Sequence, residues 1–374
     1  MRESFIPYGR QNINEQDLQA VLQVLQSDWL TTGPIVERFE QDVATFVGQA
    51  HAVSVSSGTA ALHAAMHAIG IAPGDEVIVP PMTFAATANA VVYQGGTPVF
   101  ADVDPATLLL DPQAVVNRIT ARTKAVVAVD YAGQPADFDA LRSVARDHGL
   151  YLVADACHSI GAADRGRPCG SLADLSVFSF HPVKPITTGE GGMVVTNDPL
   201  LARRLQIFRN HGITSDHRQR HENGAWFYEM VELGYNYRLS DIHSALGISQ
   251  LQRLPKWIER RRQIAAAYDA AFGASPVRPL HVRSGVTHGY HLYVVRVKER
   301  DSLFNDLRAA GIGVNLHYIP VHLHPFYRRH FKTSEGLCPV AEQAFGEILT
   351  LPIFPAMGEE DVARVVDEVL RRAG

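Results

Sequence analysis

One lysine of this sequence lies between two prolines, a position that suits a reactive side chain. Lys184 lies between Pro182 and Pro185, soon after the apolar run Leu175–Phe180. Proline fixes its backbone angle and lacks an amide hydrogen, so we expect Lys184 on a restricted loop, outside any helix or central strand. A lysine is usually a solvated surface charge, whereas a desolvated lysine beside other cationic groups can attack a carbonyl. The glycine-rich stretch Thr188–Gly192 favours close backbone packing after it.

An aspartate ends a second apolar run. The pattern of Tyr151–Asp155 predicts a buried strand with Asp155 as its last residue. A buried carboxylate is costly unless it is paired, which favours a cationic partner such as a protonated ring nitrogen. Asp155 could equally cap a neighbouring loop, and this residue alone leaves both interpretations open.

Small residues connect the apolar run Ala52–Val55 to a helical stretch that begins near Ala60. Gly58 and Thr59 lie at this junction. Amides and hydroxyls at a helix N-terminus bind anions, and the helix dipole adds to the attraction, so the junction fits a phosphate. It also fits an ordinary Ser or Thr N-cap. It is not a Walker loop, because no Gly-Lys-Ser/Thr follows the glycine.

The lysine, the aspartate and the possible anion site together fit one cofactor. Ligands of open α/β sheets bind at the carboxyl ends of the strands, where all three features are expected. Pyridoxal phosphate needs an anion site, a lysine for the Schiff base and an acid that faces the pyridine nitrogen. Phe84, which follows another apolar run, supplies a flat side chain for the ring face. The sequence therefore predicts a pyridoxal phosphate site.

The elements that must position these residues follow from short apolar runs that alternate with helical stretches. Such runs indicate strands covered on both faces, and the alternation indicates an α/β domain with a mainly parallel sheet, which we place at residues 48–238. The predicted strands are Ala52–Val55, Glu76–Val79, Pro98–Asp102, Ala125–Asp130, Tyr151–Asp155, Leu175–Phe180 and Met193–Thr196.

Helical segments flank this domain. Residues 1–47 are expected to be helical, with Asn14 as an N-cap and an apolar stripe of Leu18, Val21, Leu22 and Leu25 behind it. Residues 239–374 are expected to hold connecting helices, broken at Pro255, and a small C-terminal α+β domain. Its predicted elements are strands at 290–297 and 314–318 and helices at 301–310 and 359–372. The polar segment 216–232, with its interleaved aromatic residues, is expected to be a surface loop.

Composition excludes several classes of protein. The chain has 374 residues and a formal net charge of −5, without the basic footprint of a nucleic-acid-binding protein. No apolar run approaches the roughly 18 residues that span a bilayer, and the start lacks the apolar region of a secretory signal. The three cysteines cannot form a disulfide framework. We expect a cytoplasmic enzyme with neither a membrane nor a nucleic acid as partner.

Other kinds of site fit less well. His317, His322 and His324 are interrupted by prolines, so we expect no metal centre there. Cys157 is expected to pack against the sheet, as free cysteines usually do. The first strand lacks the G-x-G-x-x-G of a dinucleotide-binding dehydrogenase. A non-catalytic cofactor-binding regulator is the remaining alternative, and the presence of Lys184 and Asp155 weighs against it.

These residues resemble those of a known family, the DegT/DnrJ/EryC1/StrS sugar aminotransferases, which are fold type I pyridoxal phosphate enzymes. The resemblance runs from about Phe5 to about Val369 and implies a large domain with a mainly parallel seven-stranded sheet. The segments that carry it are Ser57-Gly58-Thr59, Pro81–Asn89, Asp155–His158, Ser179–His181, Lys184 and Gly234–Arg238.

The resemblance implies roles for these residues. Lys184 would form the Schiff base with pyridoxal 5'-phosphate and shuttle a proton, and Asp155 would keep the pyridine nitrogen protonated. His158 would lie near the phenolic oxygen of the cofactor, and Phe84 would stack on its ring. Contacts to the phosphate are implied for Gly58, Thr59 and Ser179.

The resemblance also implies a homodimer in which Asn236 reaches the active site of the neighbouring subunit. Asn236 could instead cap the helix that opens at Ser240. Residues implied to contact the nucleotide-sugar are Asp28, Trp29, Leu30, Thr31, Gly58, Ser179, Asn236, His317, Tyr318, Ile319 and Pro320.

Within the family the chain most resembles the aminotransferases of pseudaminic acid biosynthesis, on the segments Val129–Gly133 and Phe178–Gly192. This implies transfer of an amino group from L-glutamate to C4 of a UDP-linked 4-keto-6-deoxy-N-acetylhexosamine. The product would be UDP-4-amino-4,6-dideoxy-N-acetyl-β-L-altrosamine. Relatives that act on other nucleotide-linked keto-sugars share much of the same pattern. Some branches carry histidine in place of the lysine and act as dehydratases, so Lys184 favours transamination.

Overall fold

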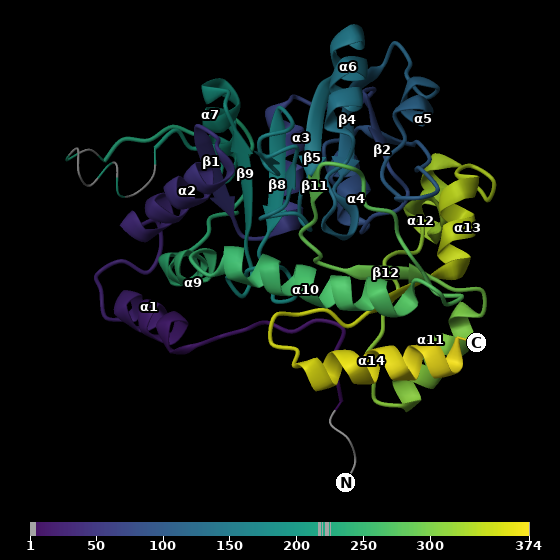
Figure 1. The fold of residues 1–374 in the computed structure, drawn as a ribbon. Coiled ribbons are helices and arrows are strands. Elements are labelled where there is room, and N and C mark those ends of the chain that lie inside the picture. The colour runs from purple at the N-terminus through teal and green to yellow at the C-terminus, as the bar shows by residue number, and fades with distance from the viewer. Residues whose placement is uncertain (1–4, 216–217, 219, 221–223, 225, 374) are drawn as a thin grey trace.

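A seven-stranded sheet forms the centre of the computed structural model, which describes residues 5–215, 218, 220, 224 and 226–373 (Figure 1). All seven predicted strands lie in it, with ends within a few residues of those expected. They are β1 (His51–Val55), β2 (Glu76–Val79), β3 (Thr97–Phe100), β4 (Thr123–Val129), β5 (Tyr151–Asp155), β8 (Leu175–Ser179) and β9 (Gly192–Thr196).

The strand order is β1-β9-β8-β5-β4-β2-β3. Strand β9 is antiparallel to both of its neighbours, and the other pairs are parallel. Strands β1, β5 and β8 therefore end at the same edge of the sheet. The predicted α/β fold with a mainly parallel sheet is confirmed, and the antiparallel β9 makes the sheet mixed.

Helices cover both faces of this sheet, as the continuous apolar runs predict. One face packs against α3 (Gly58–Ala68), α4 (Ala86–Tyr93) and α7 (Pro199–Phe208). The other packs against α2 (Pro34–Val47), α6 (Phe138–His148) and α9 (Asp241–Leu251). Short elements complete this part of the chain: α5 (Pro112–Val116), η1 (Tyr131–Gly133), β6 (Ala163–Asp164) and β7 (Arg167–Pro168).

Helix α1 (Glu15–Leu25) begins at the predicted N-cap, where the Asn14 side chain accepts a hydrogen bond from the backbone of Asp17. Its packing differs from the expectation. Leu18 and Leu22 are 56% and 43% exposed, because the helix packs on α9 through a polar face. The buried Asp17 on that face pairs with Arg253. The periodicity correctly predicts the helix but not the face that is buried.

The C-terminal elements form a third core. Helices α10 (Leu254–Phe272), α11 (Arg300–Ala309) and α14 (Glu359–Arg372) pack around strands β10 (Arg278–Pro279), β12 (Tyr293–Arg296) and β13 (Ile348–Leu351). Figure 1 shows α10 lying between the large sheet and α14. Helices α12 (Pro325–Phe331) and α13 (Pro339–Glu347) pack against the large sheet, and β11 (Val286–Thr287) and η2 (Val321–Leu323) complete the chain.

One predicted strand of this region is wrong. Residues 314–318 form only a single bridge, between Asn315 and Thr350, because the segment turns away over the large sheet. The break between α9 and α10 falls near Pro255, as predicted, and α14 has the predicted ends. The proposed domain limits at 47/48 and 238/239 stay predictions.

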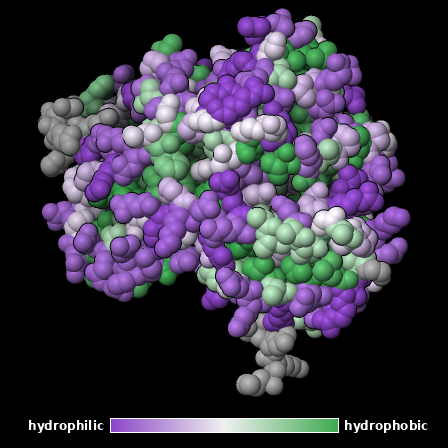
Figure 2. Space-filling model, viewed as in Figure 1, coloured by the Kyte–Doolittle hydropathy of each residue, from purple (hydrophilic) through white to green (hydrophobic). Residues whose placement is uncertain are grey.

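Polar residues cover most of the face seen in Figure 2, and apolar residues gather toward the lower right, near α11 and α14. Within the described ranges, no helix is long and apolar enough to cross a bilayer. Part of the predicted surface loop 216–232 lies outside the described residues. Trp226 and Phe227, which are described, are 85% and 59% exposed.

Candidate active site

A cavity of about 660 Å³ opens at the sheet edge where β1, β5 and β8 end. Its position agrees with the rule that ligands of open α/β sheets bind at the carboxyl ends of strands. The predicted site residues that line it are Gly58, Thr59, Phe84, Asp155, His158, Ser179, Lys184, His317 and Tyr318. The structure thus brings together residues that are up to about 260 positions apart in the sequence.

Helix α3 points its N-terminus into this cavity. Ser57 is the N-cap, and its hydroxyl accepts a hydrogen bond from the amide of Ala60 at 3.1 Å. Gly58 allows the first turn to approach the end of β8, since a Cβ at this position would lie 2.7 Å from the Cβ of Ser179. The N-cap interpretation is confirmed, and the phosphate site stays a prediction, which the amides and hydroxyls beside the cap support because such groups can bind an anion.

Asp155 is buried at the end of β5, with 6% of its surface exposed. One carboxylate oxygen accepts a hydrogen bond from the Thr87 hydroxyl at 2.7 Å, and the other accepts one from the Cys157 amide at 3.3 Å. The second bond supports the interpretation of Asp155 as a local cap. No ion pair joins it to another of the described residues. A buried carboxylate of this kind is suited to a cation brought by a ligand.

Lys184 lies on the loop between β8 and β9, outside any helix or strand, as its flanking prolines predict. Its side chain is half-buried at the wall of the cavity. Burial lowers the pKa of the Lys184 ammonium, and the neighbouring Cys157 and Asp155 partly oppose this shift. The neutral amine that attacks a carbonyl is therefore more accessible here than on a solvated lysine.

Three histidines surround the lysine. The Nε2 of His158 lies 3.0 Å from the Tyr318 hydroxyl, and the rings of His158 and His291 are 4.5 Å apart. The Nδ1 of His317 lies 2.9 Å from the Thr350 hydroxyl. Burial, reinforced by Lys184, holds the pKa of all three well below the usual range, and that of His317 falls to about 3. At neutral pH these side chains are uncharged hydrogen-bonding groups.

His158 also keeps one polar atom without a partner. Its Nδ1 is buried and makes no hydrogen bond to the other described residues. An unpaired buried nitrogen is costly, so this atom is suited to a polar group of a ligand. Phe84 is 62% exposed at the cavity, which leaves its ring free to cover a flat molecule. The cavity residues therefore fit pyridoxal phosphate.

The predicted sugar-binding residues do not all reach this cavity. The four residues 28–31 line a separate cavity of about 590 Å³, because Thr31 pairs with Ser240 at the start of α9. Ile319 is exposed and Pro320 is buried, and neither lines either cavity. Within one chain these residues therefore do not share one cavity, and their contacts with the nucleotide-sugar stay a prediction.

Asn236 also lies outside the main cavity of its own chain. It is exposed and pairs with Asn210 through the backbone. It does not cap the following helix, because Ser240 is itself the N-cap of α9. That alternative interpretation is wrong.

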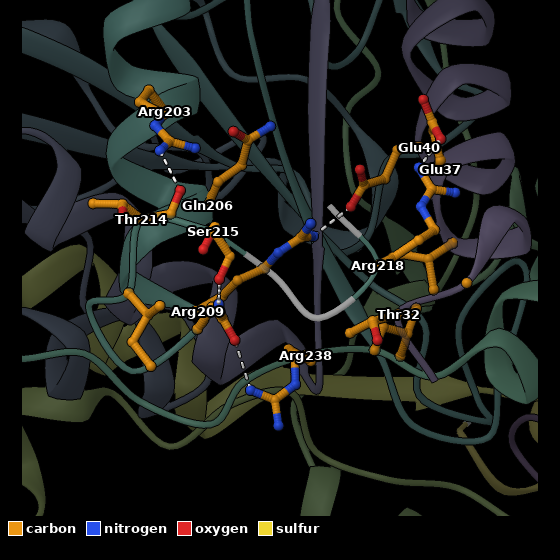
Figure 3. Close-up of a pocket in the computed structure, with 15 residues that line it drawn as sticks. Thr32, Glu37, Glu40, Arg203, Gln206, Arg209, Thr214, Ser215, Arg218 and Arg238 are labelled. Carbon is orange, nitrogen blue, oxygen red and sulfur yellow. Dashed lines mark hydrogen bonds and ion pairs between the residues drawn. The ribbon is translucent and has the colours of Figure 1, made fainter. Parts of the chain in front are cut away.

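A third cavity, of about 180 Å³, lies near residues 28–31 and is rich in arginine (Figure 3). Arg238, which lines both of these neighbouring cavities, donates to the Asn210 side chain at 2.8 Å. Arg203 donates to the carbonyl of Thr214, and Arg209 pairs with Glu40. Burial and the charge of Arg209 lower the pKa of Arg238.

Several residues that line the cavity were not predicted from the sequence. Tyr8, Thr87, His291 and Asn315 line the cavity, and they reach it from four separate segments. Only Thr87 carried a signal, since it belongs to the segment Pro81–Asn89 that was already singled out. Cys157 lines the cavity instead of packing only against the sheet, and burial raises the pKa of its thiol. No group of three or more metal-ligating side chains gathers among the described residues.

Comparison with known proteins identifies a family whose model matches most of the chain. The model of the DegT/DnrJ/EryC1/StrS aminotransferase family matches residues 11–370. The chain is 41% identical over 378 residues to the spore coat polysaccharide biosynthesis protein SpsC of Bacillus subtilis, covering 98% of this chain and 97% of that protein.

Two solved structures are similar along their whole length. A putative sugar aminotransferase from Streptococcus pneumoniae, in its PMP form, superposes with a TM-score of 0.94 at 31% identity, covering 98% of this chain and 99% of that one. PseC of Helicobacter pylori, an aminotransferase involved in the biosynthesis of pseudaminic acid, superposes with a TM-score of 0.93 at 32% identity, covering 99% of both chains.

Proposed function

The chain belongs to the DegT/DnrJ/EryC1/StrS aminotransferase family and is a pyridoxal phosphate-dependent sugar aminotransferase, and from that premise we propose its substrates. The proposed amino donor is L-glutamate, and the proposed acceptor is C4 of a UDP-linked 4-keto-6-deoxy-N-acetylhexosamine. Donor and acceptor would exchange an amino group for a keto oxygen, which gives 2-oxoglutarate and the 4-amino sugar. The observation that carries the proposal is the cavity shared by Lys184, Asp155 and the N-terminus of α3.

The cofactor would be held by residues of this cavity. Bound pyridoxal phosphate supplies an electron sink for the carbon that loses a proton. Asp155 would hold the proton on the ring nitrogen, and the unpaired Nδ1 of His158 would bind the ring oxygen. Phe84 would cover one face of the ring. The phosphate would be bound by Gly58, Thr59 and Ser179.

Lys184 would have two tasks in this scheme. Its amine would bind the cofactor covalently and would later move a proton to and from the reacting carbon of the substrate. Attack on the cofactor and removal of the proton both need the neutral amine, which the lowered pKa of Lys184 favours, and the ammonium formed by that removal would return the proton. His291 and His317 lie beside Lys184 and are neutral, so they add no positive charge next to it.

The nucleotide would lie nearer the surface. Arg238 and the segment 28–31 line the cavity of about 590 Å³, and arginines bind phosphates well. His317 and Tyr318 line the cofactor cavity and would contact the sugar. The likeness to PseC supports a pseudaminic acid precursor as acceptor.

A dimer would bring the two sets of residues together. We propose a homodimer in which Asn236 of one subunit contributes to the cavity of the other. Exposed apolar residues support this proposal, since Leu18, Leu22 and Leu25 share one face of α1 and are 56%, 43% and 54% exposed in a single chain. Such side chains are unusual on the surface of a monomer when they gather into a patch.

The visible absorption spectrum tests the proposal. The protein with pyridoxal phosphate should show a yellow band that bleaches when L-glutamate is added, and Lys184→Ala should abolish the bleaching. Lys256→Ala, which changes an exposed lysine on α10, is the matched control and should bleach like the wild type. A UDP-4-keto-6-deoxy-N-acetylhexosamine should then restore the band. A band that ignores glutamate would contradict the proposed donor and favour a non-catalytic regulator.

One observation favours a second acceptor. The identity to SpsC, a polysaccharide biosynthesis protein, is 41%, whereas that to PseC is 32%. The alternative is transfer to a different nucleotide-linked keto-sugar. A TDP-linked 4-keto-6-deoxyhexose that restores the band faster than the UDP-linked sugar would support it.

A further inference from the structure

Three buried oxygen groups form a line in the wall of the cofactor cavity. The Thr83 and Thr87 hydroxyl oxygens are 2.7 Å apart, and the Thr87 hydroxyl lies 2.7 Å from Oδ2 of Asp155. Thr83 and Thr87 are 2% and 1% exposed, and Asp155 is 6% exposed. All three groups are therefore largely shielded from bulk water.

The direction of these hydrogen bonds follows from their chemistry. An ionised carboxylate only accepts hydrogen bonds, so the single hydroxyl hydrogen of Thr87 must be donated to Asp155. The hydrogen between the two threonines then comes from Thr83. The line runs from Thr83 to Thr87 to Asp155, and each hydroxyl polarises the next.

This line constrains how the carboxylate faces the cavity. Oδ2 is held by Thr87, while Oδ1 has only the longer bond of 3.3 Å from the Cys157 amide. A carboxylate has about four lone-pair positions, so two remain for a ligand. The bond from Thr87 fixes the rotation of the side chain and thereby the direction in which these positions point.

We propose that Thr87, with Thr83 behind it, is the positioning residue that holds Asp155 in the orientation that binds the ring nitrogen of the cofactor. This inference rests on the proposed function, since it assumes that the cavity holds pyridoxal phosphate. Phe84 lies in the same segment, and its carbonyl accepts a hydrogen bond from the amide of Thr87 at 3.2 Å. The backbone of this segment therefore connects the hydroxyl line to the residue proposed to cover the ring face.

Two substitutions at one position separate this role from packing. Thr87→Val keeps the shape of the side chain and removes the donor, whereas Thr87→Ser keeps the donor and removes a methyl group. We expect Thr87→Val to raise the Kd of the apoprotein for pyridoxal phosphate by about tenfold or more. Loss of a hydrogen bond that orients a binding residue typically weakens affinity for the bound group by this amount. Thr87→Ser should restore the Kd to within about threefold of the wild type.

A third variant controls for the loss of any buried threonine hydroxyl. Thr196 is also 1% exposed and donates to the carbonyl of Asp174 at 2.8 Å, at the opposite edge of the sheet. Thr196→Val should lower the urea midpoint of unfolding and leave the Kd unchanged. In a double-mutant cycle, Thr83→Val should weaken binding in the wild type and have little further effect beside Thr87→Val.

The outcomes separate the inference from the proposed function. A Kd that suffers more from Thr87→Ser than from Thr87→Val would show that Thr87 acts by packing and would overturn the inference. Equal Kd values for both variants and the wild type would also overturn it. If the wild type binds pyridoxal phosphate but does not bleach with glutamate, the proposed function fails while the Kd comparison still decides the inference. A wild type that does not bind pyridoxal phosphate overturns both.

Discussion

Gly192, at the start of β9, is expected to be intolerant of even one added methyl group. A Cβ there would lie 2.3 Å from the carbonyl oxygen of Ser57, 2.5 Å from its carbonyl carbon and 2.8 Å from the amide nitrogen of Gly58. All three are backbone atoms and cannot rotate away. Gly192→Ala must therefore displace either β9 or the first turn of α3, whose amides face the cavity.

The expected magnitude follows from two opposing effects. Overpacking of this kind costs about 1–3 kcal/mol. Replacing glycine by alanine within a strand recovers about 0.5–1 kcal/mol through the entropy of the unfolded chain. Because the contacts are with backbone and well below 3.0 Å, we expect the upper part of the range and a net loss of about 2 kcal/mol. Displaced amides should also weaken cofactor binding by about tenfold or more.

The assay compares Gly192→Ala with a glycine that has free space. Gly346 is exposed near the end of α13, and a Cβ added there would meet no atom within 4 Å, so Gly346→Ala should gain up to about 1 kcal/mol. Urea unfolding of the apoproteins and titration with pyridoxal phosphate measure both effects. If Gly192→Ala unfolds and binds cofactor like the wild type, the close approach of β9 to α3 does not shape the phosphate site.

Two further predictions concern pH and assembly. Burial, with a smaller effect of His67, lowers the pKa of His63 to about 4. In the unfolded chain His63 is protonated near pH 6.5, whereas in the folded chain it stays neutral down to about pH 4. Stability should therefore fall as the pH drops through this window, and His63→Gln should flatten the dependence of the urea midpoint on pH; an unchanged slope would refute this. The double variant Leu18→Glu/Leu22→Glu should halve the mass measured by light scattering without unfolding the chain, because both side chains are exposed. A wild type that is already monomeric would contradict the proposed dimer.

The strand ends were predictable because their signals are local. Asp155 closes a continuous apolar run, and Lys184 is confined by two prolines, so each could be placed without knowing what packs against it. His291 and Asn315 offered no such signal. They reach the cavity only because the C-terminal part of the chain folds back over the large sheet, and that packing depends on contacts between distant segments.

The same distinction explains the errors. The spacing of Leu18 and Leu22 correctly predicts a helix, but spacing does not say which face packs against the rest of the chain. That choice is made by Asp17, which is buried beside Arg253 and turns the leucines outward. The substrate residues were grouped by resemblance. The fold of one chain places most of them along two separate cavities, and it places Asn236, Ile319 and Pro320 along neither.

Charge separates these cavities. The cofactor cavity has no arginine among the described residues of its wall, and its histidines are held neutral. Its proposed anion site consists of amides and hydroxyls at the start of α3. The neighbouring cavity has Arg220 and Arg238 in its wall. Salt screens charges near the surface far more than buried dipoles. A roughly tenfold rise in ionic strength should therefore raise the KM for the nucleotide-sugar several-fold and change the Kd for pyridoxal phosphate much less. Equal salt dependence of the two constants would refute this division, because it would mean that one set of charges binds both phosphates.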